Sequence, residues 1–189
     1  MRVLGVDPAA AGPTGYGVVE TDGCNCRMLR FGALPARRGS SRKDFPARLR
    51  EIHALIAQLI AEFSPDSVAV ESVFTALNTK TALRLAEVRG VVMLAAAQGN
   101  VPVHSYSPRE VKASVAGYGH ASKQQMQLMV GALLRMTETP EPADAADALA
   151  VALCHIQAAS ASARLAAPDA SPAPGARSRA AAARIPVVR

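Results

Sequence analysis

The chain has 189 residues, of which 50% are hydrophobic and 19% are charged, a balance that suits one globular domain with a sizeable core. No apolar run is expected to reach the length of a membrane span, and the opening MRVLGVDPAA lacks the order of a signal peptide, so we expect a cytoplasmic protein with no membrane partner. The net charge of +6 is compatible with a nucleic-acid partner, although the basic surplus lies mostly after residue 157.

The first part of the sequence predicts three strands joined by tight turns. Residues 2–7, RVLGVD, form a short apolar run that ends in an acid, which is typical of a buried strand. Glycines and a proline then predict a turn, and further strands are expected at residues 16–20 and 26–35. Three strands this close in sequence predict an antiparallel meander at the N-terminus.

Helices and strands alternate in the remainder of the chain. Leucines and isoleucines at helical spacing predict an amphipathic helix at residues 45–63. The expected elements after it are a strand, a helix, a strand and three helices, at residues 64–72, 78–98, 101–106, 107–115, 122–136 and from about 142 onward. Ser122 is suited to cap the N-terminus of one helix, and Pro142 is suited to the first turn of the last.

This order of elements predicts an α/β fold with three layers, in which helices flank a mixed five-stranded sheet. We assign the domain to residues 1–157. Residues 158–189 are rich in alanine, proline, serine and arginine and contain few large apolar side chains. We therefore expect a disordered basic tail after the domain.

Four acidic residues fall at the ends of predicted elements. Asp7 ends the first strand, and Glu71 ends the fourth. Asp144 and Asp147 are three residues apart in the first turns of the last helix, which places them on one face. Strand ends and helix starts converge where ligands bind in sheets of this kind, so the four carboxylates are candidates for one shared site.

Such a cluster of acids needs cations to neutralise it. Oxygen ligands without a cysteine or histidine set favour Mg²⁺, with Mn²⁺ as a substitute, and two such ions support hydrolysis of a phosphodiester bond. The helix dipole alone favours an aspartate in a first turn by ~0.3–1 kcal/mol, so each acid taken singly has an ordinary structural explanation. The prediction depends on the combination of two strand ends, VD and VES, with DAAD on a helix.

Five segments resemble the RuvC-type bacterial Holliday junction resolvases in order and spacing: GVDPAAAGPTGYGVV, VAVESVFTALN, ALRLAEVRGVVMLAAA, VKASVAGYGHASKQQMQLMV and ADAADALAVALCH. The resemblance covers about residues 1–157 and implies a ribonuclease H-like fold. It also implies a homodimer that resolves Holliday junctions in DNA recombination and repair, by nicking two strands of like polarity with Mg²⁺. A junction-binding and branch-migrating complex of the RuvA and RuvB type is the implied protein partner.

The resemblance also implies roles for particular residues. The metal-binding and catalytic residues it implies are Asp7, Glu71, Asp144 and Asp147. The DNA-binding residues it implies are Phe74, Asn78, Lys112 and Lys123. A lysine supplies a charge for phosphate, and an aromatic ring can stack on an exposed base with ~1–3 kcal/mol; a solvated lysine and a core phenylalanine are the ordinary alternatives.

The loop after Asp7 departs from the pattern of the family. The family usually carries glycine directly after DP, whereas this chain has Ala9 and Ala10 there and one residue more before TGYG. Because alanine adopts positive φ poorly, the loop beside Asp7 is expected to take a different path.

Gly90 would let a second helix approach helix 78–98 in a dimer, although burial within one subunit explains the apolar helix equally well.

Three other functions fit parts of the sequence. A general ribonuclease H-like nuclease acting on RNA–DNA hybrids or on RNA would use the same acids. An ATP-dependent phosphotransferase of the actin-like type would use a similar phosphate loop, but it needs two such domains and a longer chain. A non-catalytic junction-binding protein would need no acid cluster, so the presence of all four acids favours an enzyme.

Overall fold

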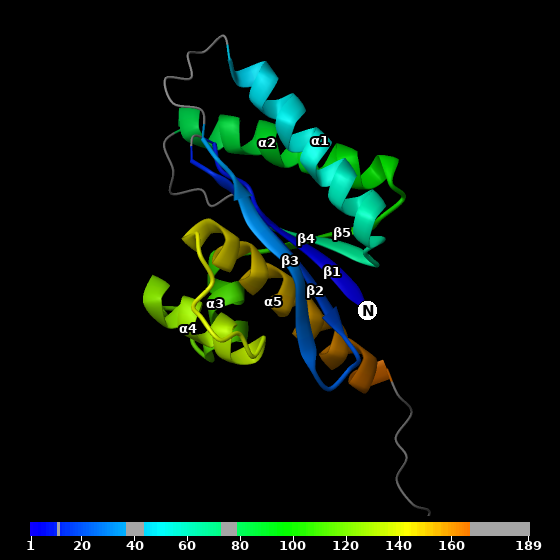
Figure 1. Ribbon diagram of the computed structural model, residues 1–189, viewed down its shortest axis with the longest axis vertical. Helices are drawn as coiled ribbons and strands as arrows, with labels where there is room; N and C mark the ends of the chain where they lie inside the picture. The colour runs from blue at the N-terminus through cyan, green and yellow to red at the C-terminus, as the bar shows by residue number, and fades with distance from the viewer. Residues whose placement is uncertain (11, 37–43, 73–78, 167–189) are drawn as a thin grey trace, which may run out of the picture.

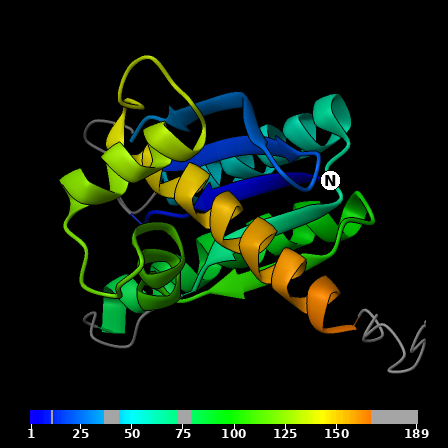
Figure 2. The same cartoon turned by 90° about the horizontal axis from the view of Figure 1, so that it is seen from below.

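A mixed five-stranded sheet lies between two layers of helices (Figures 1 and 2). The structure is a computed structural model and describes residues 1–10, 12–36, 44–72 and 79–166. The strands are β1 (Arg2–Asp7), β2 (Thr14–Thr21), β3 (Cys26–Leu34), β4 (Ser67–Glu71) and β5 (Val103–Tyr106), in the spatial order β3-β2-β1-β4-β5. The first three form the predicted antiparallel meander, and β4 and β5 run parallel to β1. The predicted mixed sheet is confirmed.

The helices divide between the two faces of the sheet. They are α1 (Phe45–Phe63), α2 (Thr79–Gln98), α3 (Pro108–Ala116), α4 (Lys123–Leu133) and α5 (Ala143–Ala166). Helices α1 and α2 cover one face, while α3, α4 and α5 cover the other (Figure 1). The predicted three-layer α/β arrangement is therefore confirmed.

Alternating side chains of the strands build one hydrophobic core on each face. In β1, Val3 packs with residues of α3, α4 and α5, whereas Leu4 packs with residues of α1 and α2, and both side chains are fully buried. This is the period of two that a strand buried on both faces requires. The register of β1 is thereby fixed, because a shift by one residue would exchange the two cores.

Helix α5 lies unusually close to the sheet, across β1 and β2 (Figure 2). A Cβ atom at Gly15 would collide with the carbonyl oxygen of Asp144, and one at Gly5 would collide with that of Ala148. Only glycine permits this approach of helix backbone to strand backbone. The two glycines therefore determine how near the start of α5 comes to the end of β1.

We expect Gly15→Ala to lower both stability and activity, because its methyl group must push the start of α5 off β2. Overpacking of this kind costs ~1–3 kcal/mol, and the free energy of unfolding in urea measures it. The matched control is Gly131→Ala in α4, where a new Cβ finds only ordinary contacts and alanine is favoured in a helix by ~0.5–1 kcal/mol. Equal stability of the two variants would contradict the steric role of Gly15.

The apolar content of α5 exceeds what the sequence led us to expect. Its segment Ala143–Leu165 contains an 18-residue window with a mean hydropathy of 1.2, so the helix is long and apolar enough to cross a membrane by length and composition alone. The expectation that no apolar run reaches that length was therefore wrong. Leu149, Leu153 and Ile156 of this segment are buried in the core on the sheet, so packing accounts for the apolar side chains.

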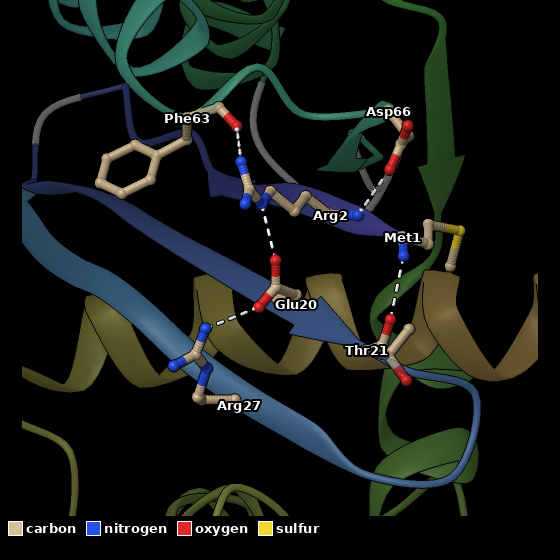
Figure 3. A network of polar contacts seen from close by, with 7 residues as sticks. All are labelled: Met1, Arg2, Glu20, Thr21, Arg27, Phe63 and Asp66. Atoms are coloured by element: carbon tan, nitrogen blue, oxygen red, sulfur yellow. Dashed lines mark hydrogen bonds and ion pairs between the residues drawn. The ribbon is translucent and has the colours of Figure 1, made fainter.

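Polar contacts secure β1 at the end opposite Asp7 (Figure 3). The Arg2 Nε donates to Glu20 Oε1 of β2 at 2.8 Å, and an Arg2 guanidinium nitrogen donates to the Phe63 carbonyl oxygen at 3.0 Å. The Arg2 amide also donates to Asp66 at 2.6 Å. These groups are exposed, so each contributes little stability, but together they tie β1 to its neighbours.

The bounds of two late helices differ from the sequence prediction. Helix α4 ends at Leu133 rather than at residue 136, and Arg135 just beyond it has a φ of 52° that turns the chain. Helix α5 continues past residue 157 to Ala166. The expectation of a disordered tail from residue 158 is therefore wrong for residues 158–166, which are helical. Residues 167–189 of that tail lie outside the described residues, and the domain assignment of 1–157 stays a prediction.

Candidate active site

Two of the four candidate acids lie side by side at the ends of adjacent parallel strands. Strands β1 and β4 pair with Val6 opposite Val70, and the next residues along each strand are Asp7 and Glu71. The two strands point the same way, so both carboxylates lie at the same edge of the sheet. Buried valines before them fix the strands in this register.

The other two acids reach the same place from α5. Asp144 and Asp147 lie at its start, and the Asp144 carbonyl rests against Gly15, the partner of Asp7 in the β1–β2 ladder. Asp144, Asp147 and Glu71 all raise the pKa of Asp7 by their charge. The structure thus brings together the four acids that the sequence singled out.

Burial and the charges of neighbouring acids dominate the electrostatics of Asp7 and Glu71. Burial, followed by the charges of Glu71, Asp147 and Asp144, raises the pKa of Asp7 from 3.8 to about 8, and Lys123 opposes this. Burial and Asp147 also raise the pKa of Glu71, while Lys112 and Lys123 lower it. Carboxylates so placed are stabilised in their charged form by any cation that enters.

Lys123 already supplies one positive charge to this group. Its Nζ lies 3.0 Å from Asp147 Oδ2, and this contact raises the pKa of the lysine. Lys123 is the first residue of α4, where the helix dipole disfavours a cation. Ser122 places it there through a capping box with Gln125, as the sequence predicted for Ser122, so the lysine is held at the acids despite the dipole.

A cavity of about 290 Å³ opens beside the acids. Its lining includes Glu71 and Asp147 from the acid group and both predicted lysines, Lys112 of α3 and Lys123 of α4. Acidic and basic side chains therefore face one space, where a phosphate could approach the lysines while cations neutralise the acids. Phe74 and Asn78, the other two predicted DNA-binding residues, lie outside the described residues.

The sequence predicted no role for His155, but its side chain contacts the end of the strand that lies beside Glu71. Tyr106, the last residue of β5, pairs with Glu71 in the β4–β5 ladder. Its hydroxyl lies 2.7 Å from Nδ1 of the buried His155, which belongs to α5. Burial and the stacked His104 lower the pKa of His155. This contact joins α5, which carries Asp147, to β5, the strand that pairs with β4 beside Glu71, and no sequence pattern signals it.

The donor set fits a hard divalent cation. All four candidate ligands are carboxylates, the donors that such a cation prefers, and burial, followed by the charges of Glu71, Asp147 and Asp144, raises the pKa of Asp7. In the described part of the chain, no three acidic, histidine or cysteine side chains lie close enough to hold an ion as they stand. A cation held by these acids would therefore need a rearrangement of side chains, and Asp147 pairs with Lys123 in this structure.

Known proteins are similar to this chain in sequence and in fold. The family model Crossover junction endodeoxyribonuclease RuvC matches residues 3–155. The RuvC endonuclease of Natranaerobius thermophilus is 46% identical over 84% of this chain and 96% of its own, and that of Salinispora arenicola is 45% identical over 88% and 94%. The structure of Thermus thermophilus RuvC in complex with a Holliday junction substrate has a TM-score of 0.78 at 36% identity, covering 86% of this chain and 96% of that one.

A mixed sheet in this strand order, with helices on both faces and carboxylates at the ends of adjacent strands, defines a nuclease of the ribonuclease H-like class. Within that class, the chain belongs to the RuvC family of crossover junction endodeoxyribonucleases. A more distant structure, the yeast mitochondrial resolvase Ydc2, shares the fold with a TM-score of 0.56 at 14% identity.

Proposed function

We propose that this chain resolves Holliday junctions in DNA recombination and repair, by nicking two strands of like polarity at a four-way junction. The observation that carries the proposal is the convergence of Asp7, Glu71, Asp144 and Asp147 in a chain of the RuvC family. A non-catalytic junction-binding protein has no use for four carboxylates that destabilise one another. The same acids would serve a nuclease of RNA–DNA hybrids, so the substrate has to be tested directly.

Asp7, Glu71, Asp144 and Asp147 would hold Mg²⁺, two ions per site, with Mn²⁺ as a substitute. Held by these four carboxylates, Mg²⁺ would supply activation of a water and stabilisation of the leaving oxygen of the phosphodiester. The chain itself positions the reacting strand and fixes the carboxylates at the end of the sheet. Lys123 is suited to exchange its contact with Asp147 for one with a DNA phosphate once cations neutralise the acids.

Lys112 and Lys123 would contact the DNA backbone beside the acids, because both line the same cavity. Their contribution to binding should fall as salt rises. We assign Phe74 and Asn78 to the same DNA surface from the family resemblance. An aromatic ring there would stack on a base at the open centre of the junction.

Two nicks related by symmetry require two active sites, so we propose a homodimer. An exposed stripe on α2 supports it, with residues spaced alternately by three and four as in a two-helix seam. The stripe consists of Leu83, Ala86, Gly90, Met93 and Ala97. Leu83 and Met93 expose 62% and 42% of their surface, and a Cβ at Gly90 meets open space.

We expect Met93→Glu to convert the dimer into a monomer, because two facing carboxylates in an apolar seam are costly to bury. Light scattering after size-exclusion chromatography measures the mass in solution. The matched control is Leu128→Glu on α4, where the leucine is 64% exposed but lies outside the stripe. Monomerisation by Leu128→Glu alone would move the proposed interface to α4.

We further propose that the protein acts in the cytoplasm, alongside a junction-binding and branch-migrating complex of the RuvA and RuvB type. A nuclease specific for junctions needs a partner that forms or moves those junctions, and the family resemblance implies a complex of this kind.

The deciding experiment incubates the purified protein with a synthetic four-way DNA junction, in Mg²⁺ or in EDTA. Linear duplex and an RNA–DNA hybrid serve as control substrates. Paired, symmetric nicks near the junction centre, only with metal and only on the junction, are the expected result. Cutting of the hybrid would favour the general nuclease, and binding without nicks would favour the non-catalytic protein.

A further inference from the structure

Arg48 of α1 is a buried cation that donates hydrogen bonds to backbone carbonyl oxygens and to one hydroxyl, and the charge of Glu51 also acts on it. Its residue is only 7% exposed. One guanidinium nitrogen donates to the Pro35 carbonyl oxygen at 2.7 Å, and the other reaches the carbonyl oxygens of Leu34 at 3.1 Å and Gly12 at 3.3 Å. A bond to the Thr14 hydroxyl at 3.2 Å completes this arginine cluster.

The cluster joins three segments that are distant in sequence. Gly12 lies in the connection between β1 and β2, and Thr14 is the first residue of β2. Leu34 is the last residue of β3, and Pro35 follows it. Asp7 pairs with Gly15 across the same connection. Arg48 therefore lies at the end of the sheet where the candidate active site is built, and it contacts the segment that follows Asp7.

Arginine is suited to this position in a way that lysine is not. Its planar guanidinium offers five donors in a fixed fork, so one side chain can bond to several carbonyl oxygens at once. Thr14 is fully buried, so no solvent replaces the arginine at its hydroxyl. Buried carbonyl and hydroxyl groups without partners are costly, which makes the cluster a strong constraint on the path of the backbone.

The bonds of Arg48 constrain the connection between β1 and β2, which is where this chain departs from the pattern of its family. Ala9 and Ala10 stand where glycine is usual, and neither is among the described residues with positive φ. The connection therefore turns without the special backbone of glycine at these two positions. Arg48 instead bonds to Gly12 and to Thr14, where this connection leads into β2.

We propose that Arg48 is a positioning residue of the active site, which holds the β1–β2 connection so that the Asp7 carboxylate faces Glu71, Asp144 and Asp147. The inference rests on the proposed role of Asp7 as a metal ligand. In this role Arg48 would contact neither the metal nor the DNA. Arg48 affects cleavage indirectly, because it fixes the position of Asp7 as outer-shell groups orient metal ligands.

The test compares Arg48→Met, which removes every donor, with Arg48→Lys, which keeps the charge but lacks the fork. Arg50→Met, on the exposed side of α1, controls for loss of a basic residue. Leu59→Ala, in the buried face of α1 away from the cluster, controls for loss of stability alone. Each variant is measured for junction binding in EDTA, for the Mg²⁺ concentration that gives half-maximal cleavage, and for thermal unfolding.

A readout that needs neither metal nor DNA separates this inference from the proposed function. It is amide hydrogen exchange in EDTA, in peptides that contain Gly12, Thr14 and Leu34. For Arg48→Met we expect faster exchange confined to these peptides, and a roughly 10–100-fold rise in the half-saturating Mg²⁺ concentration, as loss of an outer-shell partner produces. Arg48→Lys should fall between the wild type and Arg48→Met, with junction binding in EDTA unchanged throughout.

Wild-type exchange and wild-type Mg²⁺ dependence in Arg48→Met would overturn the inference. So would an equal rise in the Mg²⁺ requirement in Leu59→Ala, since it would assign the effect to stability alone. If Arg48→Met does not fold, Arg48→Lys decides, because a wild-type Mg²⁺ requirement in that variant contradicts the need for the fork. Failure of the wild type to cut junctions would refute the proposed function and would leave the exchange result to decide the role of Arg48 in holding the connection.

Discussion

Asp7→Asn is expected to abolish cleavage of a four-way junction, by roughly 10³-fold or more, while junction binding is retained. Asp7 lies at the centre of the acid group, because the charges of Glu71, Asp144 and Asp147 all act on it. An amide cannot supply the negative charge that a divalent cation needs. Loss of a negative charge also reduces repulsion of DNA phosphates, so binding should be equal or tighter.

Single-turnover cleavage in Mg²⁺ and a binding titration in EDTA measure the two effects separately. Asp144→Asn should behave in the same way, because its carboxylate belongs to the same group. Glu62→Gln, an exposed acid on α1, is the matched control and should cleave at the wild-type rate. Full cleavage by Asp7→Asn or by Asp144→Asn would refute the four-carboxylate site.

The sequence was sufficient to predict the sheet and the position of the acids because both depend on local patterns. Buried strands such as RVLGVD are short apolar runs, and their last residue necessarily lies at an edge of the sheet. Parallel pairing of β1 and β4 then brings Asp7 beside Glu71. The start of α5 follows from its acids and its proline, which are typical of a first helical turn.

Contacts between distant segments could not be predicted in this way. Arg48 is one of several basic residues in an amphipathic helix, and nothing in that pattern distinguishes it from the exposed Arg50. The bond between Tyr106 and His155 joins residues that are 49 positions apart. Such pairs arise from the packing of α1 and α5 on the sheet, and a single sequence carries no periodic signal for them.

The close approach of α5 to the sheet is an intermediate case. The glycines of VLGVD and TGYG are visible in the sequence, and glycine in a strand often marks a close backbone neighbour. Which neighbour approaches is decided only in three dimensions, where Gly15 meets Asp144 and Gly5 meets Ala148. The glycines in the sequence predict where a close backbone contact occurs, and the packing of the fold determines which residues of α5 make it.

The second large effect is a loss of stability of the metal-free protein as pH rises. The pKa of Asp7 is 3.8 ordinarily and about 8 in the fold. Between these values the folded chain holds a proton that the unfolded chain has released, so the contribution of Asp7 is full below pH 3.8 and is lost as pH rises to about 8. One such proton gives a slope of about 1.4 kcal/mol per pH unit.

Thermal and urea unfolding in EDTA between pH 5 and 8.5 measure this slope, and the difference between wild type and Asp7→Asn isolates the share of Asp7. Asp7→Asn should be the more stable protein at pH 8, because its amide needs no proton to be neutral. Mg²⁺ should stabilise the wild type more at pH 8 than at pH 5.5, since metal binding displaces the proton. Parallel stability curves for the two proteins in EDTA would show that Asp7 is not held among repelling carboxylates, and the metal site proposed here would lose its electrostatic basis.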